Sequence, residues 1–155
     1  MSSVIRPATA ADVPTLVTLM MEFYAEADFP LPEGPATRAF QTLLREPDFG
    51  VVLVADLDGV AAGHVVLTLC FSMEYGGMRG FIDDLYVRRK VRGQGTGAAL
   101  LAAARDAAIA RGVRALHVEV GPDNHVARRL YVRSGYVDSG HLLLSQPLEA
   151  PVHAS

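Results

Sequence analysis

Apolar residues recur at helical spacing near the start of the chain. The positions that share one face of a 3.6-residue period are Val13, Leu16, Val17, Met20 and Tyr24. Thr9 and Asp12 precede them with the spacing of a capping box, which marks a helix start. A short strand over Val4 to Arg6 is expected before this helix. A second helix, with Phe40, Leu43 and Leu44 on one face, is expected after a loop rich in Pro and Gly.

The pattern then changes to runs of β-branched residues that are separated by turn signals. Gly50 to Asp56 and Val60 to Phe71 flank Asp58-Gly59, a dipeptide typical of tight hairpins. Gly76-Gly77 supplies the next turn, and Arg79 to Val87 supplies another strand. The first half of the chain therefore predicts two helices and an antiparallel meander.

The second half alternates helices and strands. The pattern predicts a helix over Thr96 to Arg111, a strand over Arg114 to Val120 and a helix from Pro122 to Ser134. The strand–helix–strand unit should be parallel and right-handed. Tyr136 to Asp138 and His141 to Leu144 then predict a closing hairpin around Ser139-Gly140.

Composition narrows the class of protein. The chain has 155 residues, half of them hydrophobic, so we expect one domain over residues 1–145 and a tail over 146–155. The net charge of −3 argues against a nucleic-acid partner. The single cysteine, Cys70, lies in an apolar run, so we expect a buried thiol and no intrachain disulfide. The sequence has neither a signal-peptide pattern nor a membrane-length apolar run, so we expect a cytoplasmic protein.

A glycine-rich turn joins the strand that ends at Val87 to the following helix. It reads Arg92-Gly93-Gln94-Gly95-Thr96-Gly97 and follows three basic residues, Arg88, Arg89 and Lys90. Glycines let a ligand approach the backbone, and unpaired N–H groups at a helix N-terminus attract anions. The turn therefore predicts a pyrophosphate site.

Three interpretations of this turn compete. It could be a purely structural turn. It could bind a dinucleotide, since Gly93, Gly95 and Ala98 fit G-x-G-x-x-A, but that motif normally follows the first strand of a parallel sheet and is followed by an acidic residue about 20 positions on. It could bind coenzyme A, because Arg92 to Gly97 fits the pattern Gln/Arg-x-x-Gly-x-Gly/Ala.

A second motif favours the third interpretation. The late helix carries Asn-x-x-Ala-x-x-x-Tyr and then Gly-Tyr, at Asn124, Ala127, Tyr131, Gly135 and Tyr136. With these motifs, and with the strand Asp84-Leu85-Tyr86-Val87, the chain resembles the GCN5-related N-acetyltransferase (GNAT) superfamily from Val4 to Leu144. The resemblance implies an α/β (α+β) fold, a mixed twisted sheet of six to seven strands flanked by about four helices with a central parallel strand pair. It also implies acetyl-CoA as co-substrate.

The resemblance implies roles for particular residues. Backbone N–H groups of Arg92, Gly93, Gln94, Gly95, Thr96 and Gly97 would hold the pyrophosphate. Leu85, Tyr86 and Val87 would pair with the pantetheine arm, and an N–H group near Leu85 would polarise the thioester carbonyl. A bulge would separate this strand from the strand over 114–120, and the acetyl group would lie in the opening. Asn124 would cap the helix, contact the coenzyme or both.

The acid and the base have different candidates. By resemblance, Tyr131 is the general acid for the departing thiolate, and Asp83 matches the suspected glutamate base of diamine and polyamine acetyltransferases. Asp84 and Glu119 are further base candidates. An alkylammonium of pKa ~10.4 must lose a proton before it attacks, so some base is needed. Strand alternation puts Asp83 and Asp84 on opposite faces unless a bulge intervenes, and both could instead pair with nearby arginines.

These observations predict an N-acetyltransferase that acts on a primary amine of a small molecule, of amino acid, diamine or polyamine type. Direct attack in a ternary complex is expected because Cys70 lacks a supporting base, and no metal-ligand spacing is present. The alternatives are a protein N-terminal or lysine acetyltransferase and a non-catalytic acyl-CoA-binding module. The acceptor should contact the first two helices, the loop Phe29 to Pro35 and the turn Met73 to Tyr75. The acids on that side are Glu22, Glu26, Asp28 and Glu74. Many members of the GNAT superfamily are homodimers, so the resemblance also implies a homodimer.

Overall fold

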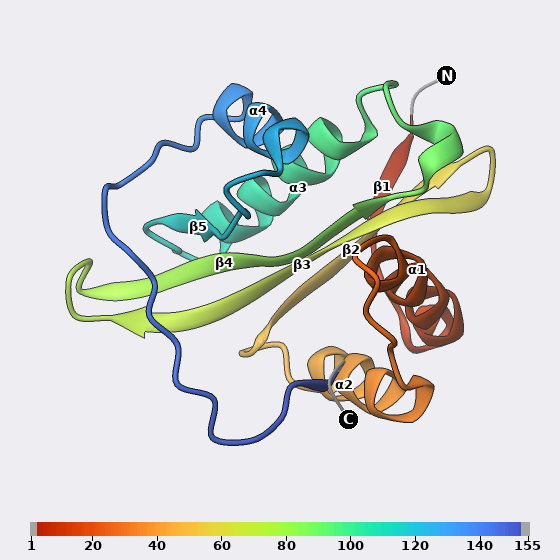
Figure 1. Ribbon diagram of the computed structural model, residues 1–155, viewed down its shortest axis with the longest axis horizontal. Helices are drawn as coiled ribbons and strands as arrows, with labels where there is room; N and C mark the ends of the chain where they lie inside the picture. Colours follow the sequence, from red (N-terminus) through yellow and green to blue (C-terminus); the bar gives the residue numbers. More distant parts are fainter. Residues whose placement is uncertain (1–2, 153–155) are drawn as a thin grey trace.

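One five-stranded sheet organises the protein, in a computed structural model that describes residues 3–152. The strands follow the order of the chain: β1 Val4–Pro7, β2 Gly50–Leu57, β3 Val60–Ser72, β4 Gly77–Val87 and β5 Leu116–Val118. β1 to β4 pair antiparallel, and β5 pairs parallel to β4. The helices are α1 Val13–Glu26, α2 Glu33–Arg45, α3 Thr96–Ala110 and α4 His125–Arg133. In Figure 1, α1 and α2 lie on one side of the sheet, and α3 and α4 lie on the other.

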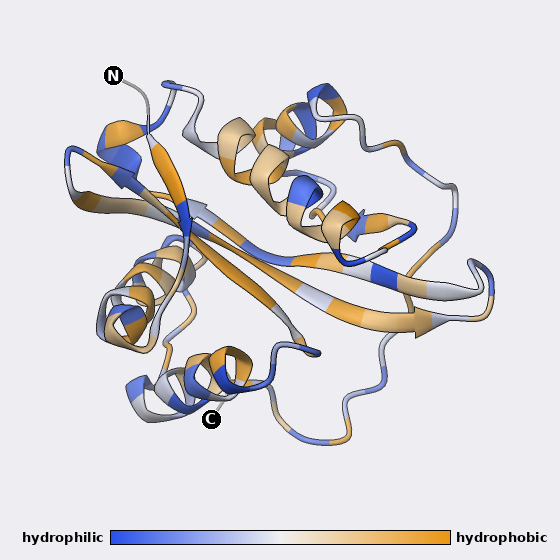
Figure 2. Cartoon of the chain, turned by 180° about the vertical axis from the view of Figure 1, so that it is seen from behind, coloured by the Kyte–Doolittle hydropathy of each residue, from blue (hydrophilic) through white to orange (hydrophobic). Residues whose placement is uncertain are grey.

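Strand alternation divides the core into two clusters. Val52 and Val54 of β2 face the α1–α2 side, whereas Leu53 and Ala55 face α3. On the α1–α2 side they meet Leu16, Val17, Ala36 and Phe40. On the other side they meet Leu100, Leu101, Ala104 and Ala108 of α3. Both faces of the central strands are therefore buried, and the strands are coloured hydrophobic along most of their length in Figure 2.

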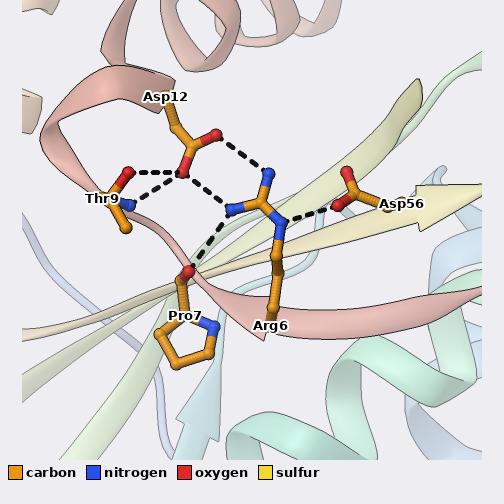
Figure 3. Close-up of polar contacts among 5 residues, drawn as sticks. All are labelled: Arg6, Pro7, Thr9, Asp12 and Asp56. Atoms are coloured by element: carbon orange, nitrogen blue, oxygen red, sulfur yellow. Dashed lines mark hydrogen bonds and ion pairs between the residues drawn. The ribbon is translucent and has the colours of Figure 1, made fainter. Parts of the chain in front are cut away.

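Arg6 ties the first strand to its neighbours. Its guanidinium donates to both oxygens of Asp12, at 2.8 and 2.9 Å, and to Asp56 of β2 at 2.6 Å (Figure 3). Asp12 also accepts from the Thr9 backbone N–H at 2.8 Å, so the expected capping box is confirmed. The hydrogen bond from Arg6 holds the pKa of Asp12 down at about 2. This cluster fixes where the chain leaves the sheet to begin α1.

The predicted mixed sheet, four helices and parallel strand pair are confirmed, but the closing hairpin is wrong. Residues 136–144 form no strand, and among residues 3–152 the sheet has five strands. Gly140 N–H donates to the Asp138 carboxylate at 2.8 Å, and His141 N–H donates to the Ser139 hydroxyl at 3.2 Å. These local bonds take the place of the cross-strand bonds that a hairpin would need.

Two smaller expectations meet different outcomes. Cys70 is exposed, so the expectation of a buried thiol is wrong. It lies near the end of β3, opposite Arg79 of β4. The tail from residue 146 is irregular as far as residue 152, and residues 1–2 and 153–155 of the expected domain and tail lie outside the described residues. Within 3–152, none of the helices combines the length and hydropathy needed to cross a bilayer.

Candidate active site

The C-terminal half of β4 has a strand partner on one side only. β5 pairs with Gly80 to Ile82 and no further, whereas β3 accompanies β4 as far as Val87. The β3–β4 register shifts between Val66 and Leu67, so Asp83 is an extra residue on β4. A bulge bends its strand and increases the local twist. Along Asp83 to Val87, the β4 edge that faces away from β3 is therefore unpaired, as the sequence analysis expected.

This edge leads directly into the glycine turn. Gly93 and Gly95 have φ of 78° and 84°, which favours glycine, and no atom lies within 4 Å of the place where either Cβ would stand. Gly95 is the N-cap of α3, so the first N–H groups of that helix have no intrahelical partner. A Cβ on Gly97 would lie 3.2 Å from Leu130 of α4, so α4 packs closely over the start of α3. The turn thus presents an open, anion-attracting helix end beside α4.

Carboxylates of α1 hold the arginines around this turn. Arg92 donates to both oxygens of Glu26, at 2.7 and 2.8 Å, and to the Val87 carbonyl at 2.8 Å. The Tyr86 hydroxyl donates to Glu26 at 3.0 Å, and the Arg92 guanidinium lies 5.5 Å from the centre of the Tyr86 ring. Burial opposes ionisation of Glu26, but these hydrogen bonds outweigh it and lower its pKa. The Arg92 side chain therefore braces the turn, while its backbone remains part of the turn.

The basic residues before the turn divide into two kinds. Arg88 donates to Glu22 at 3.1 Å and to the Ala61 carbonyl at 3.1 Å, so it is engaged within the fold. The Arg89 side chain is 78% exposed and lies 3.9 Å from Glu26, and Lys90 is exposed. Glu22 and Glu26 are thus partly neutralised, which weakens the acidic tendency expected for the acceptor side.

Asp84 is a buried carboxyl at the unpaired edge of β4. Its residue is 8% exposed, and no ion pair among residues 3–152 includes Asp83 or Asp84. Burial and then the neighbouring Asp83 raise the pKa of Asp84 to about 7. Asp83 is more exposed, and its pKa is raised by partial burial. Neither aspartate therefore forms the ion pair with an arginine that the sequence analysis left open.

Two tyrosines share the electrostatic environment of Asp84. Burial and then Asp84 raise the pKa of Tyr131 on α4, and burial, Asp84 and Asp83 raise that of Tyr24 on α1 to about 12. The Tyr131 ring packs edge-on against Tyr136, with 5.8 Å between ring centres. The charge of Asp84 on β4 therefore acts on a tyrosine of α1 and on a tyrosine of α4.

The remaining predicted site residues have simpler positions. Asn124 is the N-cap of α4, and its side chain accepts from Ala127 N–H at 3.2 Å, so the capping role is confirmed. Glu119 directly follows β5 and is exposed. Leu85 and Val87 pack on the α3 side of β4, and Tyr86 lies on the α1 side beside Phe23. Among the described residues no group of His, Cys, Asp and Glu could hold a metal ion.

Sequence reasoning missed the contacts from α1 to the turn. Glu22 and Glu26 lie four positions apart on α1, so they share one helix face, and Arg88 and Arg92 have the same spacing. Two acids and two arginines with equal spacing could have indicated that they pair with each other. Which strand the face of α1 would meet depends on the sheet order, which only the structure supplies.

Comparisons with known proteins agree on one family. The sequence profile of the Acetyltransferase (GNAT) family matches residues 15–136. An uncharacterized N-acetyltransferase, YhfO of Bacillus subtilis (strain 168), is 31% identical over 145 residues, which are 92% of this chain and 95% of that protein. The crystal structure of integron cassette protein HFX_CASS3, from the mobile metagenome of Cole Harbour Salt Marsh, is 47% identical with a TM-score of 0.90 over 96% of this chain and 93% of that one. A putative acetyltransferase from Arthrobacter sp. FB24 is 31% identical, with a TM-score of 0.79 over 95% and 96%.

The Asp84→Asn substitution should stabilise the protein above neutral pH. The pKa of Asp84 is raised to about 7, so the folded state binds this proton more tightly than the unfolded state, and stability falls as pH rises from about 4 to 7. The variant should gain up to about 4 kcal/mol in free energy of unfolding at pH 8 and almost nothing at pH 4. Urea unfolding at the two pH values measures the difference. Asp106→Asn, an exposed change on α3, is the control. An equal gain in free energy of unfolding at both pH values would contradict the raised pKa of Asp84 in the folded protein.

Proposed function

The chain belongs to the GNAT family of acetyltransferases, and on that basis we propose that it acetylates a primary amine of a small molecule by direct attack in a ternary complex. It is an N-acetyltransferase with acetyl-CoA as its co-substrate. The proposal concerns the acceptor, the catalytic groups and the order of bond changes. One observation carries it: a buried carboxyl without a cation partner, Asp84, shares its surroundings with Tyr131 at the unpaired edge of β4.

The coenzyme is proposed to follow β4 into the glycine turn. Leu85, Tyr86 and Val87 offer an unpaired strand edge, to which the amides of the pantetheine arm can add like another strand. The thioester carbonyl would then accept from a backbone N–H near Leu85, which stabilises the developing oxyanion. The pyrophosphate would meet the N–H groups of Arg92 to Gly97. Arg89 and Lys90 are exposed and could reach the 3′-phosphate, whereas Arg88 is engaged with Glu22.

Asp84 is the base that the surroundings favour. A carboxylate whose pKa lies near 7 accepts a proton much better than one of ordinary pKa while staying partly ionised at neutral pH. It would take the proton of the alkylammonium, directly or through one water. The neutral nitrogen then attacks the thioester carbon. Asp83, one residue earlier on the bulge, and Glu119, after β5, remain the competing candidates.

Tyr131 is the proposed general acid. Its raised pKa keeps the phenol protonated at neutral pH, which is the form that can donate. As the tetrahedral intermediate collapses, the carbon–sulfur bond breaks and the departing thiolate takes the phenolic proton. The products are then the acetylated amine and free coenzyme A. The nitrogen loses its second proton as the amide forms, and this proton replaces, by way of water, the one that Tyr131 gave to the thiolate. Asp84 releases the first proton to solvent, so each turnover liberates one proton.

The acceptor is proposed to enter between α1, the segment from Phe29 to Pro35 that runs into α2 and the turn around Met73 to Tyr75. Ion pairs engage Glu22 and Glu26, so of the four acids expected on that side Asp28 and Glu74 have none among the described residues. This favours an acceptor with one or two ammonium groups over a long polycation. A peptide N-terminus or a lysine side chain is the rival acceptor, and an acyl-CoA-binding module without turnover is the rival function.

A thermal shift with acetyl-CoA, coenzyme A and NADH, followed by an amine screen, tests the proposal. A ligand at 100 times its Kd stabilises by about 2.7 kcal/mol, so stabilisation by the coenzyme A species alone is expected. Release of free thiol with amino acids or diamines, and none with peptides, would support a small acceptor. Release with peptides alone would favour the protein acetyltransferase, and no release with any amine would favour the binding module.

The Gly95→Asp substitution should weaken acetyl-CoA binding at least about tenfold, because it places a carboxylate at the helix end proposed for the pyrophosphate. The change also strains the backbone, since φ is 84° there. Gly112→Asp is a matched control: φ is 73°, the surroundings are equally open, and the position ends α3 instead of starting it. Titration calorimetry compares the two variants. Similar affinities in both would contradict the placement of the pyrophosphate.

The Tyr131→Phe substitution should lower kcat by about a hundredfold while the Kd of acetyl-CoA stays within about twofold, because only the departing thiolate needs the phenolic proton. Tyr136→Phe removes the neighbouring hydroxyl, which is buried and has no hydrogen-bond partner within residues 3–152, and should change kcat little. Thiol-release kinetics and calorimetry give the two quantities. A parallel loss of affinity in Tyr131→Phe would make the residue a binding group instead of the acid.

The Asp84→Asn substitution should lower kcat/KM by about a hundredfold or more at pH 7.5. In the unmodified protein the rate should rise with pH toward about 7 as Asp84 ionises, and the variant should lose that rise. Asp83→Asn and Glu119→Gln, measured beside it, distinguish the three carboxyl candidates. If either of these lost more activity than Asp84→Asn, the base would be reassigned to it.

A further inference from the structure

Arg79, near the start of β4, is a partly buried cation without an anionic partner. No ion pair among residues 3–152 includes it. Its Nε is buried and has no hydrogen-bond partner in that range, whereas its two terminal nitrogens are not enclosed. A buried donor that is left without a partner costs folding free energy, so such groups are few in native proteins and call for an explanation.

Aromatic rings hold the Arg79 guanidinium in place. Its central carbon lies 5.2 Å from the centre of the Phe81 ring. Phe81 pairs with His117 of β5, with 5.1 Å between the ring centres, and the Tyr75 ring lies 6.0 Å from that of His117. A contact between a cation and an aromatic face positions the cation without neutralising it. Arg79 is therefore placed by its neighbours and keeps its charge.

The other titratable groups of this cluster leave that charge uncancelled. Burial and then Arg79 lower the pKa of His117, so its ring is mostly neutral at pH 7. Glu74 acts on the His117 pKa in the opposite direction, but it is exposed and forms no ion pair with Arg79. The net charge that a ligand meets at the terminal nitrogens of Arg79 is positive.

Arg79 faces the same side of the sheet as the proposed base. Ile82 packs in the core with α3, so Phe81 and Arg79, which alternate with it, face away from α3. Asp84, after the bulge, lies on the α1 side as well. Phe81 and Asp84 are three positions apart, which is roughly 10 Å at the rise of a strand. The guanidinium above Phe81 and the Asp84 carboxyl therefore border one stretch of the face proposed for the acceptor.

We infer that Arg79 binds a carboxylate of the acceptor, and that the acceptor is a primary amine with a carboxylate a few carbons away. The inference rests on the proposed function and narrows its acceptor. A guanidinium presents parallel N–H donors that match the two oxygens of a carboxylate. Hydrogen bonds of about 3 Å at the two ends leave room for a short carbon chain between Asp84 and Arg79, and the Phe81 ring would pack against that chain.

Matched pairs of acceptors test the inference. Each ω-amino acid from glycine to 6-aminohexanoate is compared with the alkylamine that has a methyl group in place of the carboxylate. In the best pair, kcat/KM from thiol release should be at least about tenfold higher for the amino acid, because a hydrogen bond to a charged group contributes that much. A carboxylate that raises kcat/KM in none of the pairs overturns the inference.

Variants of Arg79 assign the preference to this side chain. Arg79→Gln should reduce the ratio of the two kcat/KM values to about one, and Arg79→Lys, which keeps the charge without the fork, should retain part of it. Arg105→Gln, an exposed change on α3, is the control and should keep the full ratio. Thermal stabilisation by acetyl-CoA checks that each variant is folded. A ratio that survives both changes at Arg79 overturns the inference.

Binding of the expected products distinguishes failure of this inference from failure of the proposed function. Acetamido carboxylates and the matching N-alkylacetamides bind without proton transfer or turnover. With coenzyme A present, ligand-observed NMR should give a Kd at least about tenfold lower for the acetamido carboxylate, and Arg79→Gln should remove the difference. If this difference is found while no amine is acetylated, the carboxylate site stands and the proposed function fails. Equal Kd values in the unmodified protein overturn the carboxylate site even if amines are acetylated.

Discussion

The separation of β4 from β5 after Ile82 is the constraint on which the candidate site depends. A parallel pair that continued to Val87 would use the backbone groups of Leu85 to Val87 in the sheet and leave none for a ligand. The extra residue at Asp83 bends β4 and ends the pairing. The same bulge decides which side of the sheet Asp84 faces. Asp84 lies on the α1 side, near Tyr24, whereas Ile82, two positions earlier, stays in the core with α3.

The turn after β4 is rigid for a different reason, because it is braced by the helix expected to contact the acceptor. Glu26 of α1 holds Arg92 of the turn and Tyr86 of β4 together, and Glu22 holds Arg88. Exposed ion pairs contribute little individually, but the carboxylate of Glu26, which Arg92, Tyr86 and Arg89 share, fixes geometry. The part of the molecule proposed for the coenzyme and the part proposed for the acceptor are therefore in direct contact.

Much of this fold could be predicted from the sequence, because the relevant signals are local. The hairpin at Asp58-Gly59, the capping box at Thr9 and the glycine turn before α3 depend on neighbouring residues, and all are present. The closing hairpin failed because a strand needs a partner edge, which the pattern of Leu142 to Leu144 does not specify. The burial of Asp84 and the bracing by Glu26 depend on the sheet order. Resemblance alone therefore put Asp83 first as the base and left Asp84 and Glu119 as further candidates.

Asp84 connects the stability of the fold with the proposed chemistry. A carboxyl that is buried without a cation partner costs folding free energy whenever it ionises, and its raised pKa is the measure of that cost. An arginine placed beside it would remove the cost, but it would also lower the pKa and make the carboxylate a poor base. Arg88 and Arg92 follow Asp84 in the sequence, and each of them pairs with a glutamate of α1 instead. The bracing of the turn and the isolation of the proposed base are thus two results of one arrangement of charges.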